Sequence, residues 1–471
     1  MLRIALVNTN RITPPIAPIG LEYIAEILTH AGYEADILDL CWEDDWQVAM
    51  DRFFQGGEFA IAGFTIRNTD DCVFSTRHSF LGEIFEMIDY ARSATDALML
   101  LGGVGFSTMP EMILDACGAD AGIFGGGEYA MLELLRCMER HEEWGGSPGI
   151  VRRDGEGWLQ NPPRDIPTVD LPPMQRNRVD NRRYFREGGQ AGIETKRGCS
   201  WECTYCCEPL AKGSRVCTRP PLEVTTELGN LLGQGIDHIH TCDSEFNIPL
   251  GHAEQVCEEI IRSGLGDRLR WYAYCTPAPF TRHLARLMRR AGCVGINFGA
   301  DSGDETMLRR LRRRFNPEHI LNTVRFCREE GIVVMLDLLF GAPGESRESI
   351  RDTLDLVRTC GAERIGVSTG IRVWPGTDMA RQVQNRSLKA GISGGATPLE
   401  PKFFIEPALS TGIFDYIDRL IGDDERFFFF NPGDRMKNYN YDNNEVLVDA
   451  IAAGQRGAYW DILRRIAQRG F

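Results

Sequence analysis

Short apolar runs alternate along the first 140 or so residues with segments whose apolar residues recur at helical spacing. Residues 3–8 (RIALVN) suit a buried parallel strand, and residues 20–31 carry the pattern of an amphipathic helix that Gly32 is able to end. This alternation predicts a doubly wound parallel sheet, whose ligands lie beyond the carboxyl ends of the strands. The groups predicted at those ends are residues 8–11, 65–68, 102–108 and 125–128.

The same alternation returns in residues 189–385, where six strand candidates separated by helical patterns predict a full or partial barrel. Residues 142–188 interrupt the pattern, and their proline-rich stretch 161–173 (NPPRDIPTVDLPP) predicts an extended linker. Residues 386–471 show little strand pattern and one clear helix candidate, 412–430. We therefore expect an α/β protein with a doubly wound N-terminal domain over residues 1–141, a linker, a partial (βα)6 barrel and a small, mainly α C-terminal region.

Composition narrows the classes of protein that remain. Hydrophobic residues make up 43% and charged residues 25% of the 471, as in ordinary globular proteins. The net charge of −15 disfavours nucleic acid and anionic membranes as partners. No apolar run approaches a membrane span, and the first residues lack a secretory pattern, so we expect a cytoplasmic protein. Its 15 cysteines are then thiols, metal ligands or redox groups rather than a disulfide framework.

The strongest chemical signal is the segment RGCSWECTYCCEP, just after the first predicted barrel strand. It places Cys199, Cys203 and Cys206 at C-x3-C-x2-C spacing, and three such thiolates can bind three irons of a [4Fe–4S] cluster. The fourth iron then stays open for a ligand from outside the protein. Zinc and simple burial are the competing interpretations, but structural zinc takes four ligands, and the adjacent Cys207 is badly placed to be the fourth.

Around this motif the sequence resembles the radical S-adenosylmethionine (SAM) superfamily. Tyr205 stands where that family has an aromatic residue beside the cluster. The resemblance extends over about residues 190–385 through four further segments: 241–247 (TCDSEFN), 299–313 (GADSGDETMLRRLRR), 337–346 (DLLFGAPGES) and 373–379 (VWPGTDM).

The resemblance implies that the open iron binds SAM. Asp301 would then take the ribose hydroxyls, and Arg313 would pair with the SAM carboxylate, which suits a planar cationic fork. Asp243, Glu245 and Asp337 are further acceptors for the SAM amino group or ribose. The alternative for each acid is a helix cap or a solvated loop.

The N-terminal region resembles the flavodoxin-like cobalamin-binding domain of one radical SAM branch, through residues 17–40, 102–114 and 123–135. No D-x-H-x-x-G motif occurs, so no histidine ligand to cobalt is expected. Glycine at the strand ends lets backbone approach a flat macrocycle. The resemblance implies the following cobalamin contacts: Asn10, Thr65, Arg67, Asn68, Gly102, Gly103, Gly126, Gly127 and Glu128.

Arg67 is the residue expected to face cobalt, and a similar Arg-Asn pair is found in some family members, including tryptophan methyltransferases. A guanidinium stays protonated and is a poor ligand, so it would leave the lower coordination site empty and ease methyl transfer. The alternative is that Arg67 pairs with Asp70 or Asp71.

The resemblance implies a cobalamin-dependent radical SAM C-methyltransferase, in which Arg67 and Tyr205 support catalysis. It would move a methyl group from SAM through cobalamin to a carbon of a small-molecule or peptide substrate, with a flavodoxin or ferredoxin as reductant. A rearrangement, ring contraction or cyclisation is the alternative, and tRNA methylthiolation or a corrinoid carrier are weaker ones. Tyr439, Tyr441 and the run 427–430 either contact substrate or pack in an apolar core.

Overall fold

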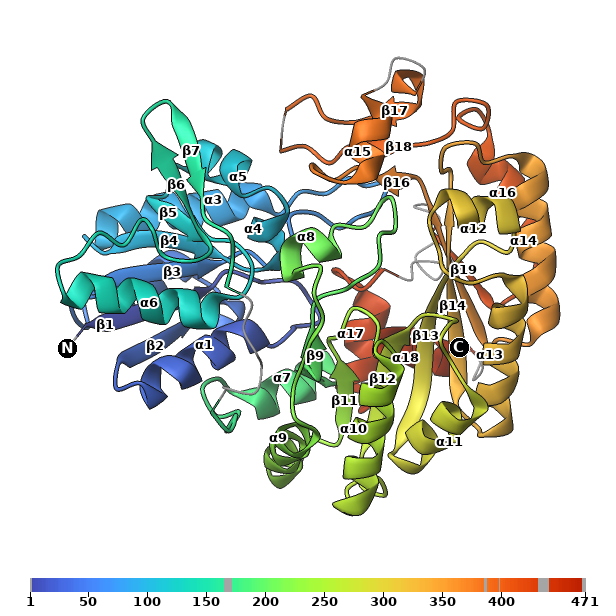
Figure 1. The fold of residues 1–471 in the computed structure, drawn as a ribbon, viewed down its shortest axis with the longest axis horizontal. Coiled ribbons are helices and arrows are strands. Elements are labelled where there is room, and N and C mark those ends of the chain that lie inside the picture. Colours follow the sequence, from blue (N-terminus) through green and yellow to red (C-terminus); the bar gives the residue numbers. More distant parts are fainter. Residues whose placement is uncertain (1, 165–171, 385–387, 398, 431–439, 468–471) are drawn as a thin grey trace.

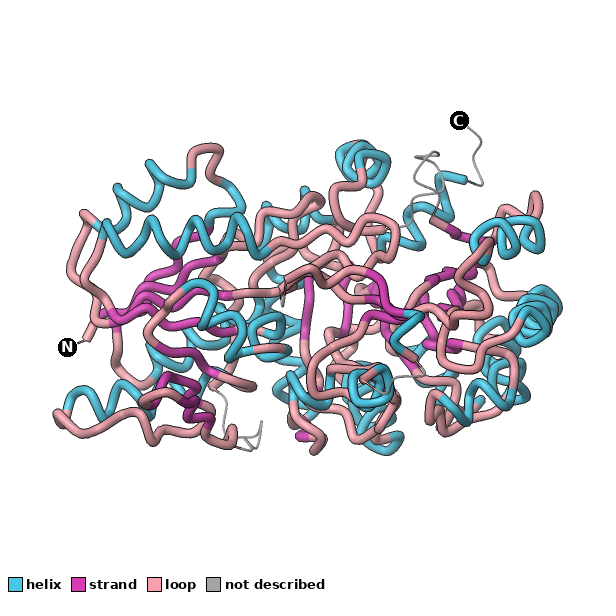
Figure 2. Tube along the Cα trace, turned by 90° about the horizontal axis from the view of Figure 1, so that it is seen from above, coloured by secondary structure: helices cyan, strands magenta, loops and turns pink. Residues whose placement is uncertain are grey.

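The computed structural model describes residues 2–164, 172–384, 388–397, 399–430 and 440–467. They form two seven-stranded sheets that lie next to each other along the long axis of the molecule, each with helices packed on it, and two small sheets of two and three strands (Figure 1; Figure 2). No helix in these described ranges is long and apolar enough to cross a membrane. The N-terminal sheet and the barrel sheet have separate hydrophobic cores.

The N-terminal sheet has five parallel strands at its centre, in the order β2-β1-β3-β4-β5. Helices α1 and α6 bury their apolar faces against one side, and α2, α3 and α5 against the other, as the doubly wound prediction requires. The strands are β1 (Arg3–Asn8), β2 (Glu34–Asp39), β3 (Ile61–Thr65), β4 (Leu98–Gly102) and β5 (Ala121–Ile123). The helices are α1 (Ile19–His30), α2 (Trp46–Phe54), α3 (Leu81–Ala94), α4 (Val104–Thr108), α5 (Pro110–Cys117) and α6 (Gly127–Glu139).

Residues 142–188, predicted as a linker, contain regular structure on both sides of the proline-rich stretch 161–173. Residues 165–171 of that stretch, which was predicted to be extended, lie outside the described residues. Strands β6 (Ile150–Asp154) and β7 (Gly157–Gln160) form a hairpin that adds two antiparallel strands to the N-terminal sheet beside β5. Helix α7 (Asn181–Gly188) ends the range, capped by the Asp180 carboxylate. The hairpin turn is short, and β6 has only its first two residues buried, so its hydrophobic signal is weak.

The second sheet confirms the partial barrel. Six parallel strands in the order β8-β11-β12-β13-β14-β15 match the six predicted units. They are β8 (Ala191–Ile193), β11 (His238–Thr241), β12 (Arg270–Cys275), β13 (Cys293–Asp301), β14 (Val333–Phe340) and β15 (Arg364–Thr369). The helices of this region are α8 (Glu208–Lys212), α9 (Pro221–Gly233), α10 (Leu250–Arg262), α11 (Arg282–Arg290), α12 (Glu305–Arg310), α13 (Pro317–Glu329) and α14 (Arg347–Cys360). Two short strands, β9 (Lys196–Arg197) and β10 (Cys217–Thr218), pair beside the sheet.

The C-terminal region contributes to the barrel more than its sequence pattern indicates. The predicted helix 412–430 is helical only as α16 (Ile413–Ile421), and its last phenylalanines form β19 (Phe427–Phe429), a seventh parallel strand next to β15. The other elements of this region are α15 (Asp378–Val383), β16 (Ile371–Arg372), β17 (Ile392–Ser393), β18 (Phe403–Phe404), α17 (Glu445–Ala452) and α18 (Tyr459–Ala467). Helices α17 and α18 pack on the inner face of the sheet, where Trp460 contacts the core formed by Tyr272, Met335 and Phe428.

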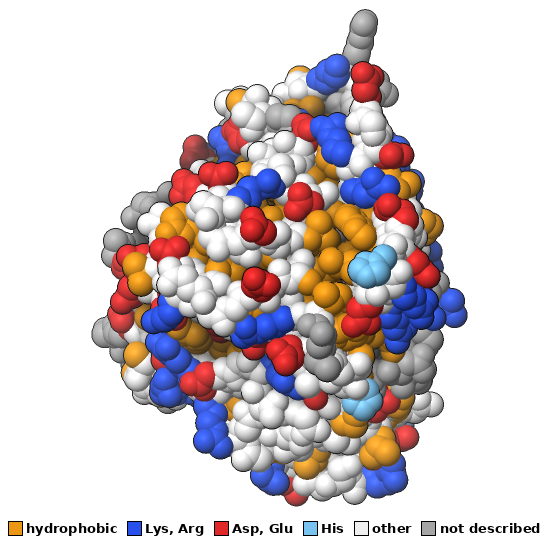
Figure 3. Space-filling view, turned by 90° about the vertical axis from the view of Figure 1, so that its left-hand side faces the viewer, with side chains coloured by type: hydrophobic (Ala, Val, Ile, Leu, Met, Phe, Trp, Pro, Cys, Tyr) orange, Lys and Arg blue, Asp and Glu red, His pale blue; other side chains and the backbone are white. Residues whose placement is uncertain are grey.

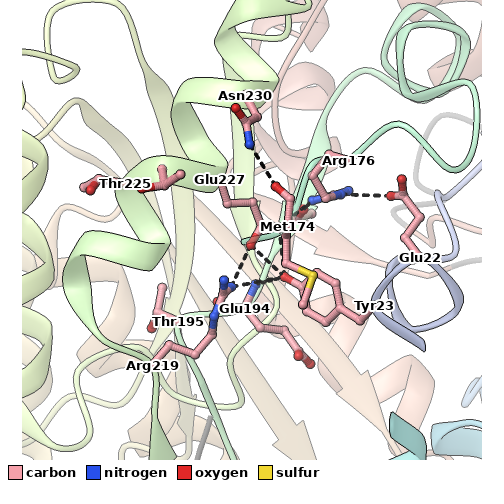
Figure 4. Close-up of polar contacts among 12 residues, drawn as sticks. Glu22, Tyr23, Met174, Arg176, Glu194, Thr195, Arg219, Thr225, Glu227 and Asn230 are labelled. Atoms are coloured by element: carbon pink, nitrogen blue, oxygen red, sulfur yellow. Dashed lines mark hydrogen bonds and ion pairs between the residues drawn. The ribbon is translucent and has the colours of Figure 1, made fainter. Parts of the chain in front are cut away.

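A buried charge network joins the two halves of the molecule (Figure 4). Arg176, which is 1% exposed, pairs with Glu22 of α1 at 2.9 Å and with Glu227 of α9 at 2.9 Å. Glu227 also accepts hydrogen bonds from Tyr23 and from Arg219, at 2.9 and 2.7 Å. Two acids and two guanidinium groups thus compensate each other without water, and α1 is tied to the barrel.

We expect Glu227→Gln to destabilise the protein strongly, because it removes the carboxylate that pairs with buried Arg219 and leaves Glu22 as the one carboxylate paired with Arg176. Removing one partner of a buried pair costs about 3–5 kcal/mol. Thermal unfolding of the holoenzyme should therefore begin at a clearly lower temperature. The matched control is Glu187→Gln, which removes a pair between half-exposed side chains on α7 and should leave the transition almost unchanged. Equal unfolding temperatures for the two variants would contradict the stabilising role of the network.

Candidate active site

The three predicted cluster cysteines share one loop that follows β9. Gly198 begins it with φ +82°, and a Cβ at this position would lie 2.1 Å from the carbonyl oxygen of Arg215, so only glycine fits. The amide of Cys199 donates to the carbonyl of Gly213 at 3.0 Å, and Cys206 closes a turn back to Cys203. The loop is therefore held by backbone contacts that leave its thiols free to bind.

Burial raises the pKa of each of the three thiols, for Cys203 to about 11. They become good ligands when a cation takes the place of the proton, so metal binding here releases protons. Among the described residues no three acid, histidine or cysteine side chains converge on a position for one metal ion. A zinc site needs such convergence, whereas a cluster takes one cysteine on each iron, so the loop fits a cluster better than zinc.

The structure brings Tyr205, Asp301 and Arg313 together next to Cys203. The Arg313 Nη1 donates to the Cys203 sulfur at 3.1 Å, and its Nε lies 3.2 Å from the Asp301 carboxylate. The Tyr205 hydroxyl donates to the same carboxylate at 2.6 Å. Asp301 has φ +57° at a bulge between β13 and β14, which turns its side chain out of the regular pleat.

Glu245 and Asp337 also lie in this neighbourhood. Glu245 is 3.7 Å from Arg313, and Asp337 accepts a hydrogen bond from Asn297 at 2.7 Å. Burial raises the pKa of both carboxyl groups to about 7. Each can therefore carry a proton or accept a hydrogen bond near neutral pH, as a contact to an amino group or a ribose requires.

Asp243 has a different place from the one predicted. Its two carboxylate oxygens accept from the amide and hydroxyl of Thr195 and from the amide of Lys196, at 2.6–3.1 Å. Both oxygens are thus used inside the protein, on the segment that leads into the cluster loop. The structure favours a role in holding that segment over the predicted contact to SAM.

A cavity of about 780 Å³ lies between the two sheets, at the carboxyl ends of the N-terminal strands. The predicted cobalamin residues on its wall are Asn10, Thr65, Arg67, Asn68 and Gly103. The Nδ2 of Asn10 is buried without a partner among the described residues, which leaves a donor for a bound molecule.

A smaller cavity of about 150 Å³ collects the other predicted glycines, Gly102, Gly126 and Gly127, together with Glu128. A Cβ at Gly102 would meet nothing within 4 Å, so the backbone there is open to a large ligand. At Gly103 a Cβ would lie 2.5 Å from the carbonyl oxygen of Ile66, so this glycine is needed for chain packing.

Arg67 does not form the ion pairs that were the alternative to a cobalt-facing role. Asp70 is bound by Arg372 at 2.8 Å, and Asp71 accepts from Thr76 and from a backbone amide. With the Asn68 amide oriented to satisfy both partners, its oxygen accepts from the Arg67 guanidinium at 3.0 Å. Arg67 and Asn68 therefore both lie on the cavity wall, and the neutral Asn68 amide holds the Arg67 guanidinium.

Inward-facing barrel residues also line the cavity. His240 lies on its wall, where burial lowers its pKa to about 4 and its ring centroid is 5.0 Å from that of Tyr274. Cys242 also faces the cavity, whereas Cys275 lies in the core on the other face of the sheet. The alternation of side chains along β11 and β12 is the signal that separates these positions.

The aromatic residues of the C-terminal region divide between core and cavity. Phe427 and Phe428 pack in the apolar cores, Phe429 is buried but also borders the cavity, and Phe430 and Tyr441 line the cavity. Tyr439 lies outside the described residues. On the N-terminal face shown in Figure 3, acidic and basic side chains are interspersed among the described residues.

Comparison with known proteins identifies the family. Residues 6–135 match the model of the B12 binding domain, and residues 193–357 match that of the radical SAM superfamily. Tryptophan 2-C-methyltransferase of Streptomyces laurentii is 33% identical over 444 residues, covering 81% of this chain and 74% of that protein. The chain belongs to the cobalamin-binding radical SAM methyltransferases.

Solved structures extend this likeness over the whole chain. Radical SAM methyltransferase TsrM from Kitasatospora setae, with tryptophan substrate and a SAM analog bound, has a TM-score of 0.93 at 31% identity, covering 100% of this chain and 98% of that one. OxsB, a cobalamin-dependent SAM radical enzyme, shares the fold with a TM-score of 0.73 at 15% identity, covering 86% of this chain and 64% of that chain. The predicted fold class, methyltransferase activity and three cofactors (cobalamin, a [4Fe–4S] cluster and SAM) are confirmed.

We expect Cys203→Ala to lose the cluster and all methyl transfer, because the remaining two thiolates cannot hold it. Iron and sulfide analysis after anaerobic reconstitution, with the visible absorbance of the cluster, measures this. Cys207→Ala is the matched control, since that thiol is adjacent to Cys206 but is not a ligand, and its iron content should stay at the wild-type level. Unchanged turnover by Cys203→Ala would contradict the cluster assignment.

Proposed function

We propose that this enzyme methylates C2 of tryptophan or of a closely similar indole, as a step in natural-product biosynthesis. The observation that carries the proposal is the cavity between the two sheets. Arg67 lies on its wall together with aromatic residues of the barrel and the C-terminal region. Those aromatic residues are Tyr274, Trp374, Phe414, Phe429, Phe430, Tyr441, Tyr459 and Trp460, and Phe74 of the N-terminal domain joins them. A planar aromatic substrate packs well against such a wall. The TsrM structure with tryptophan bound supports this substrate class.

In this proposal the chain's own residues hold the reactants. Cys199, Cys203 and Cys206 bind the cluster, and Arg313 and Asp301 bind the carboxylate and ribose of SAM. When bound, the cluster supplies an iron that binds SAM, and cobalamin supplies a cobalt that carries the methyl group. Residues at the ends of the N-terminal strands hold the corrin above the barrel mouth.

Arg67 is proposed to face cobalt when cobalamin is bound. Its guanidinium, held by Asn68, would be a poor ligand to a metal, so Arg67 would leave cobalt without a donor from this side chain. We propose that the methyl group supplied by a bound cobalamin then goes by a polar route to a nucleophilic carbon such as indole C2. Because this route consumes no reducing equivalents in each turnover, a flavodoxin or ferredoxin is needed chiefly to bring cobalt to its reactive state. We propose a cytoplasmic location, since none of the 15 cysteines, all of which the structure describes, forms a disulfide.

Product analysis tests the proposed reaction. The reconstituted enzyme should convert tryptophan and methyl-labelled SAM to an amino acid that contains one labelled methyl group at C2, as shown by mass spectrometry and NMR. A rearrangement or cyclisation adds no labelled methyl group and would contradict the methylation proposal. Label in another small molecule but not in tryptophan would retain methylation and reject this substrate.

The Arg67 proposal predicts a spectroscopic change. Arg67→Ala should admit water to the lower side of cobalt, and the EPR spectrum of bound cob(II)alamin should then show an added axial ligand. Methyl transfer to substrate should slow about 10-fold or more, which corresponds to about 1.4 kcal/mol in the barrier. The control is Arg52→Ala on the exposed side of α2, which should leave both measurements unchanged. A wild-type EPR spectrum for Arg67→Ala would reject the cobalt-facing role.

A further inference from the structure

Arg197 lies at the boundary between the N-terminal domain and the barrel domain. Here the glycine-rich loop 125–127 approaches the cluster loop, which carries Cys199, Cys203 and Cys206. Arg197 is the last residue of β9, two positions before Cys199. Its Nη2 lies 2.5 Å from a carboxylate oxygen of Glu128, and its Nε donates to Glu194 at 2.6 Å. Glu128 stands in the first turn of α6, directly after the glycine-rich loop 125–127. One guanidinium therefore links the glycine-rich loop to the start of the cluster loop.

The link is buried and electrostatically strong. The Glu128 side chain is 2% exposed and that of Arg197 is 20% exposed. Burial alone would raise the pKa of the Glu128 carboxyl, but the Arg197 charge outweighs it and lowers the pKa. Arg197 binds the two carboxylates through different nitrogens of its planar guanidinium group. This geometry fixes the direction of the contacts as well as their length.

A second contact holds the same segment from the other side. Arg219 donates to the backbone carbonyl of Glu194 at 2.6 Å and to the Tyr23 hydroxyl of α1 at 3.2 Å (Figure 4). The backbone amide of Arg219 also donates to the carbonyl of Thr195 at 2.9 Å, which fixes Thr195 as well. Residues 194–197 are thus attached to the N-terminal domain at two places, α1 and α6. The segment has little freedom to shift unless these charge contacts change.

We propose that Arg197 is a positioning residue that sets the distance and tilt between the glycine-rich loop and the cluster loop. The proposal rests on the proposed function, in which a methyl group passes between reactants held on these two loops. Transfer requires reacting atoms within about 3–3.5 Å, and a misplacement of about 1 Å can cost about 100-fold in rate. The two sheets have separate cores, so packing alone within each domain does not fix this spacing.

The test compares Arg197→Lys and Glu128→Gln in the holoenzyme. Lysine keeps the charge but loses the fork, and glutamine keeps the shape of Glu128 but loses the charge. Pulsed EPR between cob(II)alamin and the reduced cluster measures their separation without any turnover. We expect a broader or shifted distance distribution in both variants, and a 10- to 100-fold slower methyl transfer from SAM to cob(I)alamin, followed by absorbance.

The matched control is Glu26→Gln, which breaks a 3.0 Å pair with Arg178 one turn further along α1, away from the cluster loop. It should keep the wild-type distance and rate. If Arg197→Lys fails to retain its cofactors, Glu194→Gln replaces it, since that change only releases the guanidinium from its second carboxylate.

Two results would overturn the positioning role. One is a wild-type distance distribution and a rate within twofold in the variants that retain their cofactors. The other is loss of cobalamin from Glu128→Gln while Arg197→Lys stays fully active, because Glu128 would then act as a direct cobalamin ligand. Failure of the wild-type enzyme to methylate tryptophan would reject the proposed substrate alone, because the distance measurement and the methylation of cob(I)alamin use no tryptophan.

Discussion

A cavity between two separately packed sheets keeps its shape only if the sheets are held at a fixed separation. In this protein buried charge provides that restraint. Glu22 lies on α1 of the N-terminal domain and Glu227 on α9 of the barrel domain, and Arg176 binds both, so neither half can move away without leaving a buried ion unpaired. Such a network gives little net stability compared with apolar packing, but it specifies one arrangement. Specificity of this kind suits an enzyme whose two cofactor sites lie on different domains.

The parts of the site that are local in sequence could be predicted from it. Cys199, Cys203 and Cys206 lie within eight residues, and their spacing alone indicates a cluster loop. Asp301 and Arg313 were expected from the resemblance to the radical SAM superfamily; they are twelve residues apart, and with helix α12 between them they approach to 3.2 Å. In each case the chain between the residues is short, so spacing limits where the side chains can lie.

The contacts between domains could not be predicted in the same way. Arg176 and Glu22 are 154 residues apart, and nothing in either segment marks one as the partner of the other. The arginines and acids near these positions are residues that usually lie on a solvated surface. The arrangement of the two sheets, which the sequence does not show, is what buries them. The hairpin β6–β7 and the strand β19 escaped detection for a related reason. Each gains its strand conformation from pairing with a sheet edge, more than from its own pattern.

The fifteen cysteines show why position, more than thiol acidity, selects the cluster ligands. Burial raises the pKa of Cys275 and Cys293 just as it raises that of Cys206, so a low pKa does not mark the ligands. Cys275 and Cys293 lie on strands inside the core, where no cation can reach them. The three proposed ligands lie on a loop that Gly198 turns back toward Arg215, outside both strand ladders. The backbone conformation of this loop thus determines which thiols can lose a proton and bind iron.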